Sequence, residues 1–241
     1  MRLFSYKNRP VYLGPFPLER LARTDEQPDL SNVPPMGELS FEDKDNRDNL
    51  INALGPYAAM LDAIRDGMVK KERGVIPADP TERSNHLKAF AYYHDTSQAG
   101  ICALTPDMFL DTPINNAGIA KLANDLATQQ TKTLASGIDL VLAELKETMQ
   151  TPPQSITHHA RALVLLYEYP RDPKAGEAGT EWFQNAQAQR ASVRGAETAV
   201  VLANYIRLLG YDARSHTASC SEVDLNKLCL LYTSPSPRDR G

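Results

Sequence analysis

The stretch RALVLLY at residues 161–167 carries most of the fold prediction for this sequence. It is apolar on successive residues, which is typical of a strand covered on both faces and not of a strand with one solvent-exposed face. We therefore expect a central, buried β-strand here. The run is also much shorter than the ~20 apolar residues that a membrane helix needs, so the sequence indicates no membrane partner.

The segment that follows this strand favours an α/β architecture. A loop over residues 171–179 leads into a long helical pattern over 181–209, and Gly210 reads as its C-cap. Residues 211–218 then read as another strand. A strand, a long crossover helix and a second strand make up the repeating unit of a layered α/β fold.

The segment before the strand is predicted to be largely helical. Residues 50–64 have the apolar spacing of a helix, although Gly55 and Pro56 should break or kink it. The other predicted elements are a helix capped by Asp79 and Pro80 that carries Leu87, Phe90 and Ala91 inward and ends near Asp95, a short buried strand at 98–104, and helical stripes at 119–126 and 138–149.

The composition is that of a soluble globular protein. The chain has 241 residues, of which 42% are apolar, and a formal net charge of −4. It has no basic stripe, so the charge pattern gives no sign of a nucleic-acid partner. Several prolines fall before Ser40, and each removes an amide donor and fixes φ. We therefore expect residues 1–40 to form an extended, proline-rich arm.

The cysteines and the first residues indicate a reducing compartment. Cys102 and Cys220 are isolated thiols with neither a disulfide framework nor C-x-x-C spacing. The start, MRLFSYK, has no apolar segment behind its charges and no Arg-Arg pair. We therefore expect no export and a cytoplasmic location.

Few short motifs suggest chemistry, and each has a plain structural interpretation. The sequence GEAG at 176–179 precedes a helix whose free amides would suit a phosphate, but its spacing matches no nucleotide-binding pattern, and a turn is the better interpretation. His158 and His159 are neighbours that should point to opposite sides of a regular element, so we expect hydrogen-bonded histidines and no shared metal. The spacing of His216 and Cys220 would suit a helical metal site, but their segment reads as a strand, so no metal site is predicted.

Two further groups of side chains are interpreted as structural, and no residue is assigned a catalytic role. The first reads as a solvated helix surface with weak local ion pairs. Its members are Asp62, Arg65, Asp66, Arg83 and Lys88. The second is the aromatic cluster of Phe90, Tyr92 and Tyr93, which could line a cofactor cavity but is more typical of a core with a bonded hydroxyl.

Residues 229–241 do not read as native sequence. Read back into codons, CLLYTSPSPRD at 229–239 fits a transposon end and the adapter that follows it when DNA is tagged for sequencing. A natural Ser/Pro-rich tail is the alternative. We expect the native sequence to be cut near Leu228, to be the start of a longer protein, and to carry a tail that does not pack.

Four longer stretches resemble the soluble, catabolic branch of the reductive dehalogenases. They are RPVYLGPFPLE at 9–19, DPTERSNHLK at 79–88, YEYPRDP at 167–173 and LANYIRLLGY at 202–211, and the resemblance runs through residues 1–228. None of the four is a chemical motif. Function by this route is therefore inferred by analogy.

The resemblance implies a nitroreductase-like, corrinoid-binding α/β fold that is incomplete here and has a largely helical amino-terminal portion. It assigns residues 41–150 to a degenerate amino-terminal half and residues 155–228 to the start of the corrinoid-binding domain. It also implies a parent enzyme that removes halogen from an organohalide with cobalamin, two [4Fe–4S] clusters and an electron donor. The family's cluster cysteines and catalytic tyrosine lie beyond Leu228, so this chain alone is expected to hold neither cofactor and to be inactive.

Two other classes stay open. The corrinoid-dependent epoxyqueuosine reductases use the same cofactors on a tRNA base, although the acidic balance here lacks an RNA footprint. A nitroreductase-like domain that only binds a tetrapyrrole or a protein partner is the non-catalytic alternative. Two C-x-x-C-x-x-C-x-x-x-C-P runs in the rest of the gene would retain both enzymes, and their absence would leave the binding module.

Overall fold

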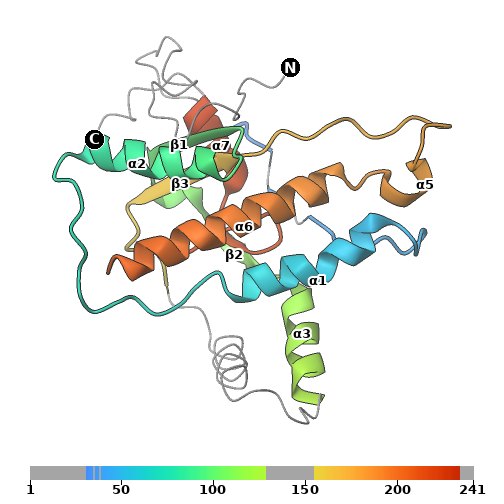
Figure 1. Ribbon diagram of the computed structural model, residues 1–241, viewed down its shortest axis with the longest axis horizontal. Helices are drawn as coiled ribbons and strands as arrows, with labels where there is room; N and C mark the ends of the chain where they lie inside the picture. Colours follow the sequence, from blue (N-terminus) through green and yellow to red (C-terminus); the bar gives the residue numbers. More distant parts are fainter. Residues whose placement is uncertain (1–30, 35, 38, 129–154, 234–241) are drawn as a thin grey trace.

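The computed structural model describes residues 31–34, 36–37, 39–128 and 155–233 (Figure 1). Most of the predicted arm at 1–40 and the predicted helical stripe at 138–149 lie outside these ranges. The elements are α1 (Leu50–Ala63), α2 (Pro80–Tyr93), β1 (Gln98–Ala103), the short 3-10 helix η3 (Pro106–Met108), β2 (Phe109–Ile114), α3 (Ala117–Thr128), β3 (Arg161–Leu166), α5 (Thr180–Phe183), α6 (Gln187–Leu208), β4 (Ser221–Val223) and α7 (Leu225–Thr233).

The described strands form two small antiparallel sheets. β1 pairs with β3 in a register that runs from Gln98 opposite Leu166 to Ala103 opposite Arg161. β2 pairs with β4, which is close to it in space but far along the chain. The predicted unit of strand, crossover helix and second strand is therefore wrong for the described residues, because β3 pairs with β1 and not with a strand that follows α6. The α/β class holds only in the coarser sense of helices packed with small sheets.

The strand predicted at 211–218 is largely absent because its polar groups bond elsewhere. Only an isolated bridge between Thr217 and Cys220 forms there. The backbone N–H of Ser215 donates instead to the carbonyl of Arg65, at 3.1 Å, and the hydroxyl of Thr217 donates to Asp62, at 2.8 Å. These bonds fix the segment against the end of α1 and leave it unavailable for a sheet ladder.

β3 contacts apolar clusters on both faces, but Val164 is its one buried residue, so the prediction of a strand buried on both faces is confirmed in part. Leu163 and Leu165 pack against one cluster, and Val164 belongs to the other. The first cluster is built from Ala91, Tyr92, Ala99 and Leu202, and the second from Cys102, Met108, Ile156, Val164, Val223 and Leu228. The prediction of a central strand is wrong for the described residues, because β1 is the one neighbour that β3 has among them.

We expect Leu165→Asp to destabilise the protein by at least about 2 kcal/mol, because it places a charge without a partner against an apolar cluster. Thermal melts compare the variant with the parent. Arg161→Asp is the matched control, because Arg161 is exposed on the same strand and its replacement should change the melting temperature little. A Leu165→Asp protein that expresses and melts like the parent would contradict the packing described here.

α1 continues through Pro56, so the prediction of a break at Gly55 and Pro56 is wrong. Asn49 caps the helix, with its side chain accepting a hydrogen bond from the N–H of Ile51 at 3.0 Å. The proline removes one hydrogen bond within the helix. Packing compensates for this loss, because Ala58 and Ala59 are buried and α1 contacts both α6 and α3.

The two predicted helix boundaries at Asp79 and Gly210 are confirmed. The side chain of Asp79 accepts from the N–H of Thr81 at 3.0 Å, and Pro80 is the first residue of α2. Gly210 follows α6 with φ of 82°, and Tyr211 donates its N–H to the carbonyl of Ile206 at 3.2 Å. This is the left-handed termination that favours glycine.

The long helix predicted at 181–209 is wrong as a single element, because it is divided into α5 and α6. Asn185 has φ of 61°, in the left-handed region, and a residue in that conformation cannot continue a right-handed helix. Its N–H donates to the side chain of Asp172 at 2.9 Å, which fixes the turn between the two helices. α6 then lies between α2 and α1 and contacts both (Figure 1).

α7 continues past Leu228, the residue near which the native sequence is predicted to end. It continues to Thr233, and Cys229 packs against the cluster that contains Leu228. Leu225, Leu228 and Cys229 have the spacing of one helix face, which explains why they reach the same cluster. The prediction that nothing after Leu228 packs is therefore wrong for Cys229, while 234–241 lie outside the described residues. Within the described ranges, no helix combines the length and the apolar character required to cross a membrane.

Candidate functional site

A buried charged network joins the end of α1 to β4 and to the segment before it. The prediction of a solvated helix surface is wrong for three of its five residues, because Asp62, Arg65 and Lys88 are only 2%, 6% and 4% exposed. Arg65 donates two hydrogen bonds to the carboxylate of Glu222, at 2.8 and 2.6 Å. The two partners lie far apart in the sequence, so no local spacing indicates the pair.

Further basic groups share the carboxylate of Glu222. Arg214 lies 3.4 Å from it and also pairs with Asp66 at 2.5 Å. Nδ1 of His216 lies 3.1 Å from Oε2 of Glu222. The backbone N–H of Glu222 also lies 3.4 Å from the same Nδ1, and one nitrogen cannot both accept and donate. We assign the proton to Nδ1, since the carboxylate can only accept and its contact is shorter.

Asp62 forms a second part of the network with neutral partners. Its carboxylate accepts from the hydroxyl of Thr217 at 2.8 Å, the hydroxyl of Ser219 at 2.6 Å and the side-chain amide of Asn116 at 2.8 Å. These donors compensate for the burial of a charged group. The arrangement ties α1, the start of α3 and the segment before β4 together, which is a structural role.

The network shifts the pKa values of its titratable members. Burial lowers the pKa of His216, although Glu222 opposes that shift. Burial raises the pKa of Glu222, but hydrogen bonds from His216 and Arg65 outweigh it and hold the pKa well below its usual range. Burial also raises the pKa of the Cys220 thiol, so this cysteine is a protonated, buried side chain and a poor metal ligand. The absence of a metal site at His216 and Cys220 stays a prediction.

Acidification is expected to destabilise the fold, starting below pH 6.5. The folded pKa of His216 lies below its ordinary 6.5, so the unfolded state takes up the proton first and stability falls as the pH decreases through that range. Glu222 adds the same effect below its ordinary pKa of 4.5. The melting temperature should therefore be lower at about pH 5.5 than at about pH 7.5. His216→Gln should flatten this difference, and an unchanged slope in that variant would contradict the assignment.

His158 and His159 converge on one carboxylate, contrary to the prediction that they point apart. Nε2 of His158 lies 2.6 Å and Nε2 of His159 lies 3.0 Å from the same Oδ2 of Asp212. The prediction failed because the pair lies in a turn and not in a regular element, while the prediction of hydrogen-bonded histidines is confirmed. Burial raises the pKa of Asp212, but hydrogen bonds from the two imidazoles lower it below its ordinary value.

The glycine-rich loop forms a turn, as predicted. Gly176 and Gly179 both have positive φ, and the helix that follows, α5, has only 4 residues. Glu177 accepts two hydrogen bonds from Arg171, at 2.8 and 2.7 Å, and these bonds with one from the backbone of Lys174 lower its pKa to about 2. The loop is organised around this exposed ion pair.

The aromatic cluster is divided between core and surface. Tyr92 is buried, and its hydroxyl accepts from the N–H of Ala99 at 3.3 Å, which confirms the core interpretation for this residue. Phe90 stacks on Tyr205 with a centroid distance of 5.4 Å. Tyr93 is 69% exposed, so it does not belong to that core.

The chain is similar to solved structures of the catabolic reductive dehalogenase NpRdhA. One structure has a TM-score of 0.62 and 32% sequence identity, covering 95% of this chain. A complex with 3-bromo-4-hydroxybenzoic acid has a TM-score of 0.63 and 32% identity over the same share. A third structure, of a reductive dehalogenase described with a mechanism for B12-dependent dehalogenation, has the same TM-score of 0.63 and 32% identity.

The chain spans 26% of the length of these proteins. No family model and no curated protein matches it. The similarity nevertheless extends over 95% of this chain and includes 32% sequence identity as well as the fold. The resemblance to the reductive dehalogenases is therefore confirmed.

Proposed function

We propose that this chain is part of an oxidoreductase that removes halogen from organohalides, because it is similar to solved structures of catabolic reductive dehalogenases. The observation that best supports this proposal is the 32% sequence identity over 95% of the chain. Since the chain spans 26% of the length of these proteins, we propose that the activity belongs to a longer protein of which this chain is one part. Its proposed cofactors are a corrinoid and two [4Fe–4S] clusters.

The residues of this chain do not fit the iron–sulfur clusters. A [4Fe–4S] cluster uses four cysteine thiolates, and the whole sequence has 3 cysteines. Cys102 and Cys220 are also buried, and no disulfide joins them. We therefore propose that the cluster ligands lie elsewhere in the longer protein. The isolated positions of Cys102 and Cys220 in the sequence, without C-x-x-C spacing, support the further proposal of a reducing, cytoplasmic location.

The sheet of β1 and β3 does not fit a corrinoid either. Both faces of β3 already contact apolar side chains of the chain itself, which argues against this sheet as the main surface for a large macrocycle. The buried network around Glu222 is likewise occupied by internal bonds. We propose that the described residues act as a scaffold and that the corrinoid is held mainly by other parts of the longer protein.

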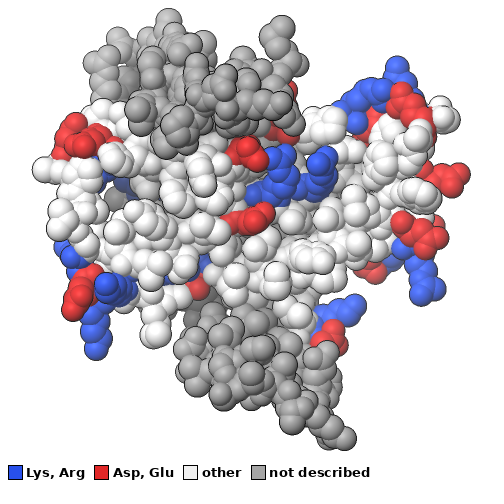
Figure 2. All heavy atoms as spheres, viewed as in Figure 1, with Lys and Arg blue, Asp and Glu red and all other residues white. Residues whose placement is uncertain are grey.

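A halogenated small molecule is the proposed substrate class. The complex of NpRdhA with 3-bromo-4-hydroxybenzoic acid supports this choice. Figure 2 shows Lys and Arg side chains interspersed with Asp and Glu side chains on the face in view, which favours a small-molecule substrate over a nucleic acid. The electron donor is proposed to be a separate partner.

The proposed function is tested by comparing this chain with a protein extended by the rest of its gene. Both are supplied with cobalamin and a strong chemical reductant, and bromide release from 3-bromo-4-hydroxybenzoic acid is measured. We expect release from the extended protein and only the free-corrinoid background from this chain. An extended protein that binds no corrinoid and releases no bromide would overturn the proposed function. Bromide release by this chain alone would instead overturn the scaffold role.

A further inference from the structure

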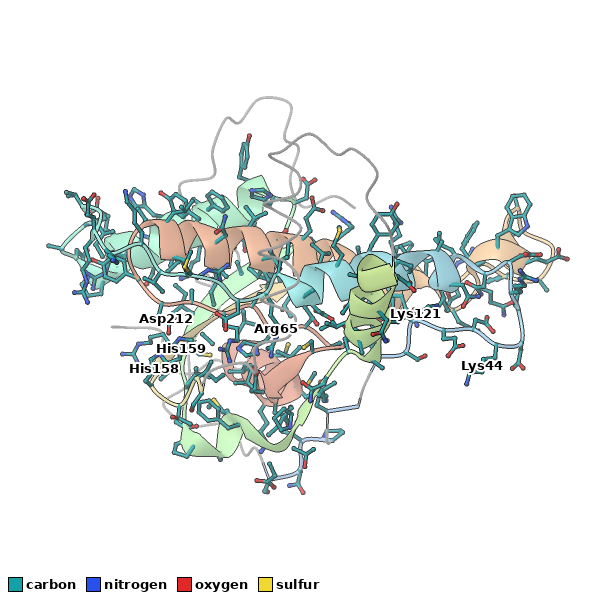
Figure 3. The ribbon with its side chains drawn as sticks, turned by 90° about the horizontal axis from the view of Figure 1, so that it is seen from below. Lys44, Arg65, Lys121, His158, His159 and Asp212 are labelled. Atoms are coloured by element: carbon teal, nitrogen blue, oxygen red, sulfur yellow. The ribbon has the colours of Figure 1, made fainter. Side chains whose placement is uncertain are left out.

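We propose that His158, His159 and Asp212 form a binding site for one divalent transition-metal ion of the zinc class. The site does not depend on the proposed dehalogenase function, because none of the three residues is assigned a role in it. Figure 3 shows the three labelled side chains together, two from the turn before β3 and one from the segment after α6.

The geometry of the donor atoms carries this inference. One ligand atom from each residue lies within 4.8 Å of the other two. Both imidazole Nε2 atoms already approach the same carboxylate oxygen, at 2.6 and 3.0 Å. Nitrogen and oxygen ligands around a tetrahedral zinc ion are about 3.3 Å apart, given metal–ligand bonds of about 2.0–2.1 Å. To accommodate an ion, the two nitrogen–oxygen distances therefore need to lengthen by less than about 1 Å.

The backbone on both sides of the site is anchored. The N–H of His159 donates to the carbonyl of Ile156 at 2.8 Å, and Ile156 is buried in the cluster around Met108. On the other side, Arg207 donates to the carbonyl of Ala213 at 2.8 Å, next to Asp212. Two anchored segments hold the ligands on a preformed frame, which lowers the cost of ordering them around an ion.

The ligand types favour zinc and leave one position open. Two imidazoles and one carboxylate are common ligands of catalytic and exchangeable zinc sites, in which water takes the fourth position. Without an ion, each Nε2 carries the proton that it donates to Asp212. When the ion binds, each imidazole adopts the tautomer protonated at Nδ1, so that Nε2 presents its lone pair without a net loss of protons. Because His158 is 59% exposed and Asp212 is 42% exposed, an ion can reach the site from solvent.

Calorimetric titration of the full chain with Zn²⁺, after removal of metal with a chelator, tests the site. We expect one ion per chain. Asp212→Asn and His159→Gln should each weaken binding at least about tenfold, because each removes one ligand while retaining hydrogen-bonding capacity. His86→Asn is the matched control, because His86 lies 3.7 Å from Glu82 in an exposed pair that has no third ligand near it among the described residues.

Cobalt provides a second readout that folding defects alone do not produce. Co²⁺ bound by two imidazoles and a carboxylate should give visible absorption bands that disappear in Asp212→Asn. Zinc bound at one hundred times its dissociation constant should also raise the melting temperature by roughly 5 °C in the parent and not in this variant. The proposal is overturned if no binding heat appears, if His86→Asn weakens binding as much as Asp212→Asn, or if a thiolate–cobalt band places the ion on Cys229.

Discussion

Glu222→Ala is expected to lower the free energy of unfolding by about 3 kcal/mol, since removing one partner of a buried ion pair leaves the other uncompensated. The side chain of Glu222 is only 15% exposed, and that of Arg65 is 8% exposed. Without the carboxylate, Arg65, Arg214 and His216 would face one another in a partly buried space. Urea denaturation at neutral pH measures the loss.

Glu177→Ala is the control for that substitution. Arg171 binds Glu177 with the same two-bond geometry, at 2.8 and 2.7 Å, but both side chains are exposed. Exposed ion pairs contribute little, because water and salt screen them. We expect the stability of this control variant to be close to that of the parent. Equal losses in the two variants would show that burial of the Glu222 pair does not determine its contribution.

Gly210→Ala is expected to destabilise the fold by about 3 kcal/mol for two reasons that can be separated. About 1–2 kcal/mol comes from a side chain in the left-handed conformation, since Gly210 has φ of 82°. The rest comes from overpacking, because the added Cβ would lie 2.6 Å from the carbonyl oxygen of Glu72. Thermal and chemical denaturation of the variant measure the sum.

Gly176→Ala isolates the conformational part of this effect. Gly176 has φ of +85°, and an added Cβ there meets nothing within 4 Å. It should therefore show only the left-handed cost, about 1–2 kcal/mol. If Gly210→Ala is no worse than Gly176→Ala, then the segment around Glu72 yields easily and the close approach has no energetic importance.

The close approach at Gly210 has a reason in the end of α6. The last carbonyls of a helix have no partners within it. Here the N–H of Lys70 donates to the carbonyl of Arg207 at 3.0 Å, and the N–H of Gly74 donates to that of Leu209 at 2.9 Å. The segment after α1 thus caps α6, and only glycine leaves room for it.

The parts of the fold that could be predicted are those with local signals. Asp79 followed by Pro80 marks a helix start, Gly210 marks a helix end, and the apolar run at 161–167 marks a strand, because each acts through neighbouring residues. The partner of that strand and the absence of the predicted strand–helix–strand unit depend on pairing between distant residues, which periodicity does not encode. Asn185 also divides the long helix through a conformation that its residue type permits but does not require.

The buried network was missed because its charges were interpreted by residue type and not by position. Ala58, Asp62 and Arg65 have the spacing of one helix face, and all three are buried. If this helix face is taken as continuous, it predicts that Asp62 and Arg65 are both buried and therefore have charged or hydrogen-bonding partners. The convergence of His158 and His159 offers no such signal, because it depends on a turn and on Asp212 arriving from the end of α6.

The pairing of β1 with β3 alone has a consequence for how this chain behaves in isolation. Among the described residues, each of these strands has a hydrogen-bonded neighbour on one side only. On β1 the N–H of Ala99 already donates to the hydroxyl of Tyr92, so among the described residues the outer edge of β3 is the one whose backbone donors and acceptors a further strand can match. Two-stranded sheets are marginal by themselves, so such an edge acts as a template for strand addition. In a longer protein it offers a place to extend the sheet, and in concentrated solutions of this chain it offers a route to aggregation.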